Sequence, residues 1–131
     1  MCGIAGAHRS AWDVGAALAR IRHRGPDGSG TAQEGATVHG HVRLALLDLT
    51  DASAQPFRYR DGLLTFNGEV WNYRELREEL SALGHEFRTT GDTEVLAAAL
   101  SQWGVAALQR LDGMFAFAWT SGVLSMLARD Q

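Results

Sequence analysis

The sequence predicts an α+β fold in a single domain, because predicted strands gather at both ends of the chain with predicted helices between them. The 131 residues match the length of one domain and suffice for one hydrophobic core. Apolar residues make up 46% and charged residues 21%, which is ordinary for a globular protein and excludes a disordered chain. We therefore treat residues 1–131 as one domain.

The first third of the chain predicts a strand, a helix and a second strand. Residues 2–7 are apolar and glycine-rich, which favours a short strand. Asp13 can cap a helix, since apolar residues follow it at helical spacing as far as Ile21. Glycine and proline predict a turn at residues 24–28, and alternating apolar residues predict a strand over 37–49.

The middle of the chain predicts another strand and a capped helix. Residues 63–66 are apolar and favour a short strand. Asn72 and Glu75 form a weak capping box, and Gly84 stands where a helix-ending glycine belongs. Residues 85–89 are expected to be extended.

The last third predicts a helix and a hairpin. Asp92 is expected to cap the helix, and Gly104 to end it. Residues 105–111 form a further short helical stretch. Alternation over 114–119, a glycine turn and an apolar stretch over 123–128 then predict a two-stranded hairpin.

Composition excludes several classes of protein. The net charge of −3 gives no electrostatic reason to expect nucleic acid or an anionic membrane as a partner. No apolar run approaches 18 residues, so no membrane span is expected, and the first residues show no secretory signal. A single cysteine cannot form an internal disulfide, which fits a reducing compartment, and we expect a cytoplasmic protein.

Cys2 is the first candidate for chemistry. Initiator methionine before a small residue is a substrate for removal, which would leave Cys2 with a thiol and a free α-amine on one carbon. At neutral pH such an amine is partly unprotonated and can take the thiol proton, so one residue supplies both nucleophile and base. The alternative is a small buried hydrophobic side chain.

Three further positions admit two interpretations each. Asn67 and Gly68 could offer an amide and an N–H group to an oxyanion, or they could form an ordinary turn. Arg43 opens an apolar segment and points either to solvent or to a buried carboxylate. Asp92 is explained by helix capping, although a carboxylate there could also hold an ammonium group.

Six motifs occur in a fixed order along nearly the whole chain. They are Met1-Cys2-Gly3-Ile4-Ala5-Gly6, Arg22-His23-Arg24-Gly25-Pro26-Asp27-Gly28, Arg43-Leu44, Asn67-Gly68-Glu69, Gly91-Asp92-Thr93-Glu94 and Leu111-Asp112-Gly113-Met114-Phe115-Ala116-Phe117-Ala118. Each is weak alone, but together they are specific. The sequence resembles the glutaminase domain of class II glutamine amidotransferases, in the asparagine synthetase branch.

This resemblance implies an N-terminal-nucleophile hydrolase fold, a four-layer αββα sandwich with mostly antiparallel sheets. Cys2 would be the nucleophile, and Asn67 and Gly68 would stabilise the oxyanion. Arg43 would bind the α-carboxylate of L-glutamine, and Asp92 the α-ammonium. The remaining substrate-binding residues would be Glu69, also at the ammonium, and backbone groups of the segment Leu44–Leu47, in particular those of Leu44, Leu46 and Leu47.

The implied reaction is hydrolysis of the glutamine side-chain amide through a Cys2 thioester, with release of ammonia. The sequence holds no pyrophosphate-binding loop of the Ser-Gly-Gly type, so this chain is expected to need no cofactor. ATP and magnesium are expected only in a partner synthetase domain or subunit. That partner would use the ammonia for aspartate or another carboxylate.

The family pattern continues with further strands after the Arg129-Asp130 pair, where this sequence ends. We therefore expect a domain that is incomplete at its C-terminus, either a fragment or one subunit of a split enzyme. An apolar last strand would then leave a sheet edge open, and a homodimer or a partner chain is expected to cover it.

Two other functions remain open from the sequence. The chain could be a catalytically silent domain that serves binding or assembly, or an N-terminal-nucleophile amidase with another substrate. No metal site is expected, since His39 and His41 share a strand face without further ligands. The four tryptophans, Trp12, Trp71, Trp103 and Trp119, are expected in the core or at a partner surface.

Overall fold

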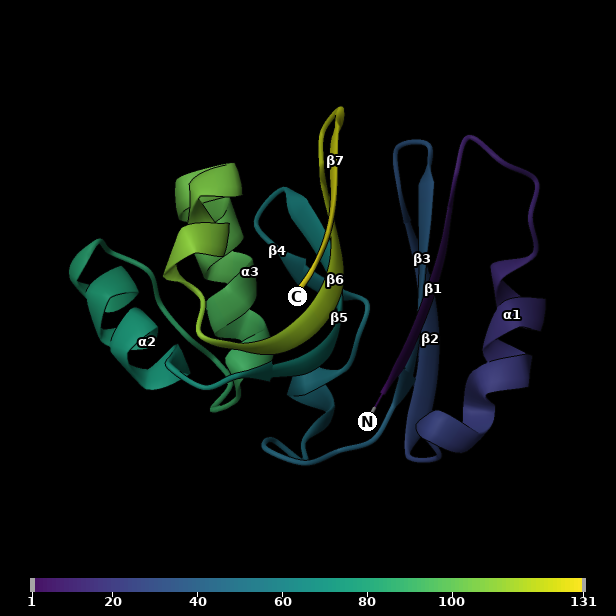
Figure 1. Cartoon of the computed structure of the whole chain (residues 1–131), viewed down its shortest axis with the longest axis horizontal. Helices are drawn as coiled ribbons and strands as arrows, with labels where there is room; N and C mark the ends of the chain where they lie inside the picture. Colours follow the sequence, from purple (N-terminus) through teal and green to yellow (C-terminus); the bar gives the residue numbers. More distant parts are fainter. Residues whose placement is uncertain (1, 131) are drawn as a thin grey trace.

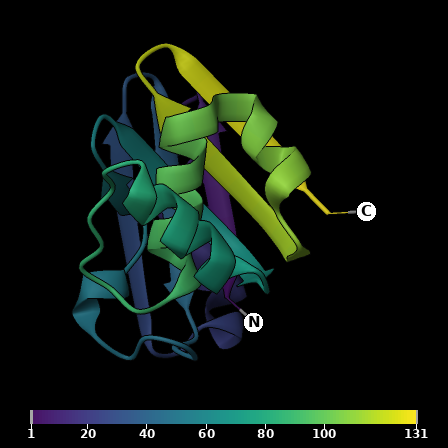
Figure 2. The same ribbon diagram turned by 90° about the vertical axis from the view of Figure 1, so that its left-hand side faces the viewer.

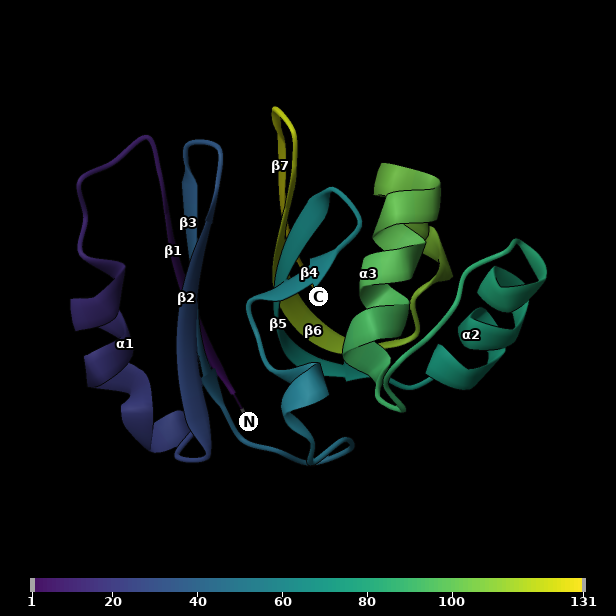
Figure 3. The same cartoon turned by 180° about the vertical axis from the view of Figure 1, so that it is seen from behind.

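The computed structural model describes residues 2–130 and has four layers. Helix α1 covers a three-stranded sheet, which faces a four-stranded sheet, and helices α3 and α2 lie behind the second sheet (Figures 1 and 3). All strand pairs within the two sheets are antiparallel. The predicted α+β class and αββα layering are confirmed.

The first sheet has the order β1-β3-β2, with β1 at Gly3–His8, β2 at Gly28–Glu34 and β3 at Thr37–Arg43. Helix α1 spans Val14–Ile21, and the predicted cap is confirmed because the Asp13 carboxylate accepts the Ala16 N–H at 3.0 Å. Val14 and Leu18 pack on the sheet against Val42. A short 3₁₀ helix, η1 at Arg22–Arg24, continues from α1.

In this half, one strand escaped prediction and another was predicted too long. Strand β2 was not predicted, because its small and polar residues alternate between half-buried and exposed without an apolar pattern. The strand predicted over residues 37–49 ends at Arg43. Beyond that point the Leu44 and Ala45 N–H groups bond to side chains rather than to a neighbouring strand.

The second sheet has the order β4-β5-β6-β7 and carries the main core. Its strands are β4 (Phe57–Tyr59), β5 (Gly62–Val70), β6 (Gly113–Ser121) and β7 (Leu124–Arg129), and β6 and β7 form the predicted hairpin. Helices α2 (Tyr73–Ala82) and α3 (Asp92–Trp103) cover its outer face (Figure 2). The 3₁₀ helices η2 (Asp51–Ser53) and η3 (Gly104–Arg110) lie in the connections, and η3 matches the predicted helical stretch.

Gly84 and Gly104, both with positive φ, follow the ends of α2 and α3 as predicted, but both predicted N-terminal caps in this half were wrong. Asn72 does not cap α2, because its side chain accepts the Asp112 N–H and donates to the Arg110 carbonyl. Asp92 is the first residue of α3 and its carboxylate accepts the Val70 N–H at 3.0 Å. Residues 85–89 form no regular strand.

The predicted edge lies at β7, where Leu127 is 83% exposed, and its coverage by a partner remains a prediction. Trp119 is buried and Trp103 packs at the core margin, whereas Trp12 and Trp71 are exposed. None of the helices within residues 2–130 is long and apolar enough to cross a membrane.

A buried histidine connects the two sheets. On β3, His39 forms hydrogen bonds with the hydroxyl of Thr65 on β5 at 3.0 Å and of Thr120 on β6 at 2.9 Å. A neutral imidazole has one donor and one acceptor nitrogen, which suits two hydroxyls. Burial lowers the pKa of His39 to about 4, so the ring stays neutral in the folded protein.

The pH dependence of the unfolding free energy tests whether His39 is buried as a neutral ring. The folded pKa of about 4 lies below the unfolded value of 6.5, so the unfolded state binds more protons and stability falls as the pH drops from 6.5 through 4. Between pH 7.5 and 5 this costs about 2 kcal/mol per such histidine. The variant His39→Gln should lose correspondingly less stability over that interval in urea unfolding.

The exposed His23 provides the matched control. The variant His23→Gln should keep the pH dependence of the unmodified chain. Equal losses for His39→Gln and the unmodified chain would show that His39 is not held neutral by burial.

Candidate functional site

At one end of the sandwich, β1 begins and the loop after β3 crosses to the second sheet (Figure 3). Residues of these segments line a cavity. All nine residues that the sequence singled out line it. They are Cys2, Arg43, Leu44, Leu46, Leu47, Asn67, Gly68, Glu69 and Asp92. They come from both sheets, from the loop and from the start of α3.

Cys2 is held by segments on both sides of it. The Leu44 N–H donates to Cys2 Sγ at 3.3 Å, and Arg24 Nε donates to the Cys2 carbonyl at 3.1 Å. The side chain is half-buried at the cavity wall. Met1, whose removal the nucleophile assignment needs, lies outside the described residues.

The turn at residues 24–28 supports this end of the sheet. A Cβ at Gly25 would lie 2.4 Å from the Val42 carbonyl carbon, so only glycine lets the turn approach β3 this closely. Asp27 accepts the Ala45 N–H at 2.9 Å through its carboxylate, and its own N–H donates to the Arg43 carbonyl. The turn thus fixes the start of the cavity loop.

Asn67 and Gly68 lie inside β5, opposite Ala116 and Phe115 of β6, which excludes the interpretation of these two residues as an ordinary turn. Gly68 has a φ of +149°, and a Cβ there would lie 2.1 Å from the Met114 carbonyl oxygen. Any other residue would therefore strain the strand. Among the described residues, the buried Asn67 Oδ1 has no hydrogen-bond partner.

Arg43 and Asp92 provide opposite charges from opposite halves of the molecule. Arg43 ends β3 and donates through Nη2 to the Asp48 main-chain carbonyl. Asp92 is 6% exposed, and burial raises the pKa of its carboxyl, an effect to which the nearby Glu69 also adds. A cation bound in the cavity would stabilise this carboxylate.

Several lining residues escaped the sequence analysis. Gln55 accepts the Phe66 N–H at 2.6 Å and so supports β5 next to Asn67. Asp48 accepts hydrogen bonds from Thr50 in its own loop and from Thr90 in the segment before α3. Only the proximity of Asp48 to Arg43 along the chain could have drawn attention to it. Within residues 2–130 no group of three or more potential ligand residues is placed to hold a metal ion.

The four antiparallel αββα layers, with a cavity beside the start of the first strand, are the architecture of N-terminal-nucleophile amidotransferases. A family model described as "Glutamine amidotransferase domain" matches residues 1–131, and the chain belongs to this family.

Two curated relatives carry the name asparagine synthetase. A putative glutamine-hydrolysing asparagine synthetase of Mycobacterium tuberculosis is 44% identical over 136 residues, covering 90% of this chain and 21% of that protein. Asparagine synthetase 1 of Bacillus subtilis is 44% identical over 99 residues, covering 74% of this chain and 16% of that protein. The chain thus spans about a fifth of the length of these relatives.

A solved structure supports the fold assignment. The glutamine phosphoribosylpyrophosphate amidotransferase from B. subtilis, complexed with ADP and GMP, matches with a TM-score of 0.76 at 25% identity. The match covers 98% of this chain and 36% of that one.

The strain at Gly68 predicts the effect of a small substitution. The variant Gly68→Ala should lose about 1–3 kcal/mol of unfolding free energy, because the new methyl group must displace the backbone of β6. Urea unfolding measures this. Gly28→Ala is the control, since its Cβ would lie 3.8 Å from the Arg43 Cβ, an ordinary contact. Equal stabilities of the two variants would contradict the stated geometry.

Proposed function

We propose that this chain hydrolyses the side-chain amide of L-glutamine and supplies the ammonia to an asparagine-synthetase-type partner domain or subunit. One observation carries the proposal: Cys2, Arg43, Asn67, Gly68 and Asp92 converge on one cavity although they belong to separate segments of the chain. The names of the relatives, glutamine-hydrolysing asparagine synthetases, agree with it.

The charges of the cavity suit a free amino acid. Arg43 can bind an α-carboxylate through two parallel N–H groups. Asp92, with Glu69 beside it, can bind the α-ammonium, and this cation offsets the cost of burying the Asp92 carboxylate. Backbone groups of Leu44, Leu46 and Leu47 would line the substrate. With its head group fixed in this way, glutamine can extend its amide toward Cys2.

The proposed chemistry begins after removal of Met1. The free α-amine of Cys2 takes the thiol proton, and Sγ attacks the amide carbon. The Asn67 side-chain amide and the Gly68 N–H donate to the oxyanion. The α-ammonium returns its proton to the leaving nitrogen, the C–N bond breaks and ammonia departs. Water then cleaves the γ-glutamyl thioester, which releases glutamate and restores the thiol.

The ammonia must be consumed by a second reaction. This chain would carry no cofactor of its own, and ATP and magnesium would belong to the synthetase partner that activates the acceptor carboxylate. A contact with that partner or with a second copy at the open edge of β7 belongs to the same proposal.

Glutamate release tests the proposal. The full chain, with Met1 removal checked by intact mass, is incubated with L-glutamine, alone and with an asparagine-synthetase-type ATP-binding domain. We expect glutamate from the unmodified chain and none from Cys2→Ala, because that variant has no nucleophile.

The control for folding is the unfolding midpoint of Cys2→Ala, which should stay close to that of the unmodified chain. If the processed protein with its partner releases no more glutamate than Cys2→Ala does, the chain is not a glutaminase.

A further inference from the structure

The proposed function places a severe geometric demand on Arg43 and Asp92. The α-carboxylate and α-ammonium of an amino acid are attached to the same carbon, so their binding groups must converge on one point. Yet Arg43 ends a strand of the first sheet, and Asp92 begins the helix behind the second. A contact that joins these two segments directly would fix their separation.

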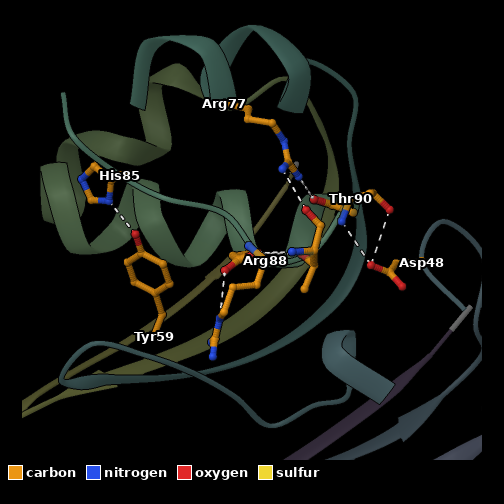
Figure 4. A network of polar contacts seen from close by, with 9 residues as sticks. Asp48, Tyr59, Arg77, His85, Arg88 and Thr90 are labelled. Carbon is orange, nitrogen blue, oxygen red and sulfur yellow. Dashed lines mark hydrogen bonds and ion pairs between the residues drawn. The ribbon is translucent and has the colours of Figure 1, made fainter. Parts of the chain in front are cut away.

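Asp48 contacts both segments, Arg43 through its main chain and Thr90 through its side chain. Its main-chain carbonyl accepts a hydrogen bond from Arg43 Nη2. Its carboxylate Oδ2 accepts the Thr90 N–H at 3.1 Å, two residues before Asp92 (Figure 4). A Cβ at Gly91 would lie 3.5 Å from the Asp48 Cβ, so the two loops are in contact at this point.

The other carboxylate oxygen of Asp48 keeps its own loop folded. Oδ1 accepts the Thr50 N–H at 2.9 Å and the Thr50 hydroxyl at 2.6 Å. These hydrogen bonds, led by that from the Thr50 hydroxyl, hold the pKa of the Asp48 carboxyl well below its usual range. The carboxylate is therefore an ionised acceptor at every pH at which the protein would work.

The segment before Asp92 is also held from the opposite side. Arg77 of α2 donates to the Thr89 carbonyl at 2.8 Å and to the Gly91 carbonyl at 2.9 Å (Figure 4). The buried Glu94 accepts the Thr89 N–H at 2.7 Å. Because Arg77 and Glu94 fix the segment before Asp92 to α2 and α3, the Asp48 carboxylate connects the loop that orients Arg43 to a fixed point next to Asp92.

We propose that Asp48 is a positioning residue that sets the separation between Arg43 and Asp92 and so determines the affinity of the cavity for the α-amino acid head group. This inference rests on the proposed function, because it takes glutamine as the ligand. Asp48 itself need not touch the reacting amide, and its effect should appear in substrate binding and not in the chemical step.

The variant Asp48→Asn tests this role. An asparagine side chain has one acceptor oxygen where aspartate has two, so the variant loses the acceptor for either the Thr50 N–H or the Thr90 N–H. The variant Asp48→Ala loses both acceptors. We expect the KM for glutamine to rise about tenfold in Asp48→Asn and further in Asp48→Ala, with kcat within about twofold. Alkylation of Cys2 by iodoacetamide, which has no amino acid head group, should keep its rate in both variants.

Asp51→Asn is the matched control. Asp51 lies in the same loop, is exposed and does not line the cavity. The variant therefore removes one negative charge but keeps the hydrogen bond between Asp48 and Thr90. Its KM should equal that of the unmodified chain. A KM for Asp48→Asn within twofold of that for Asp51→Asn, or a fall in kcat and in alkylation rate that matches the change in KM, would overturn the proposal.

Calorimetry in the Cys2→Ala background separates this inference from the proposed function, because binding is measured there without turnover. If glutamine binds and Asp48→Asn weakens binding about tenfold, the positioning role stands even where the unmodified chain forms no glutamate. If binding is unaffected by Asp48→Asn while the unmodified chain hydrolyses glutamine, the positioning role fails alone. Absence of glutamine binding to the Cys2→Ala protein would overturn both.

Discussion

The geometry of the site depends on how the start of the chain is fixed. Cys2 precedes the first strand, and a residue this close to a chain end would fray unless other segments held it. Here the Leu44 N–H binds its sulfur and Arg24 binds its carbonyl. The Arg24 contact requires the turn at residues 24–28 to pack on β3, which only a glycine at position 25 permits.

Each of the two sheets contributes different residues to the cavity. The first sheet and the loop that follows it provide Cys2 and Arg43, whereas the second sheet and α3 provide Asn67, Gly68 and Asp92. The site therefore exists only when the sandwich is closed. Hydrogen bonds that cross between these halves, such as that of His39 with the Thr65 hydroxyl and that from the Thr90 N–H to the Asp48 carboxylate, hold the sandwich closed.

The sequence predicted those features that depend on neighbouring residues. The capped helix α1 and the final hairpin follow from local spacing, and the ordered motifs identified the family. Strand β2 was missed because an edge strand of small polar residues shows no apolar alternation. The cap predicted for Asp92 was wrong because its actual partner, the Val70 N–H, lies 22 residues away along the chain. Such long-range contacts leave no periodic signal.

The most direct measurement of the central claim is the site of covalent modification by a diazo-ketone analogue of glutamine. The processed chain is treated with the analogue, with and without excess glutamine, and the adduct is located by peptide mass. The account predicts one adduct on Cys2 at a free N-terminus, suppressed by glutamine and by Arg43→Leu. A processed, folded protein that acquires no adduct at Cys2 would contradict it.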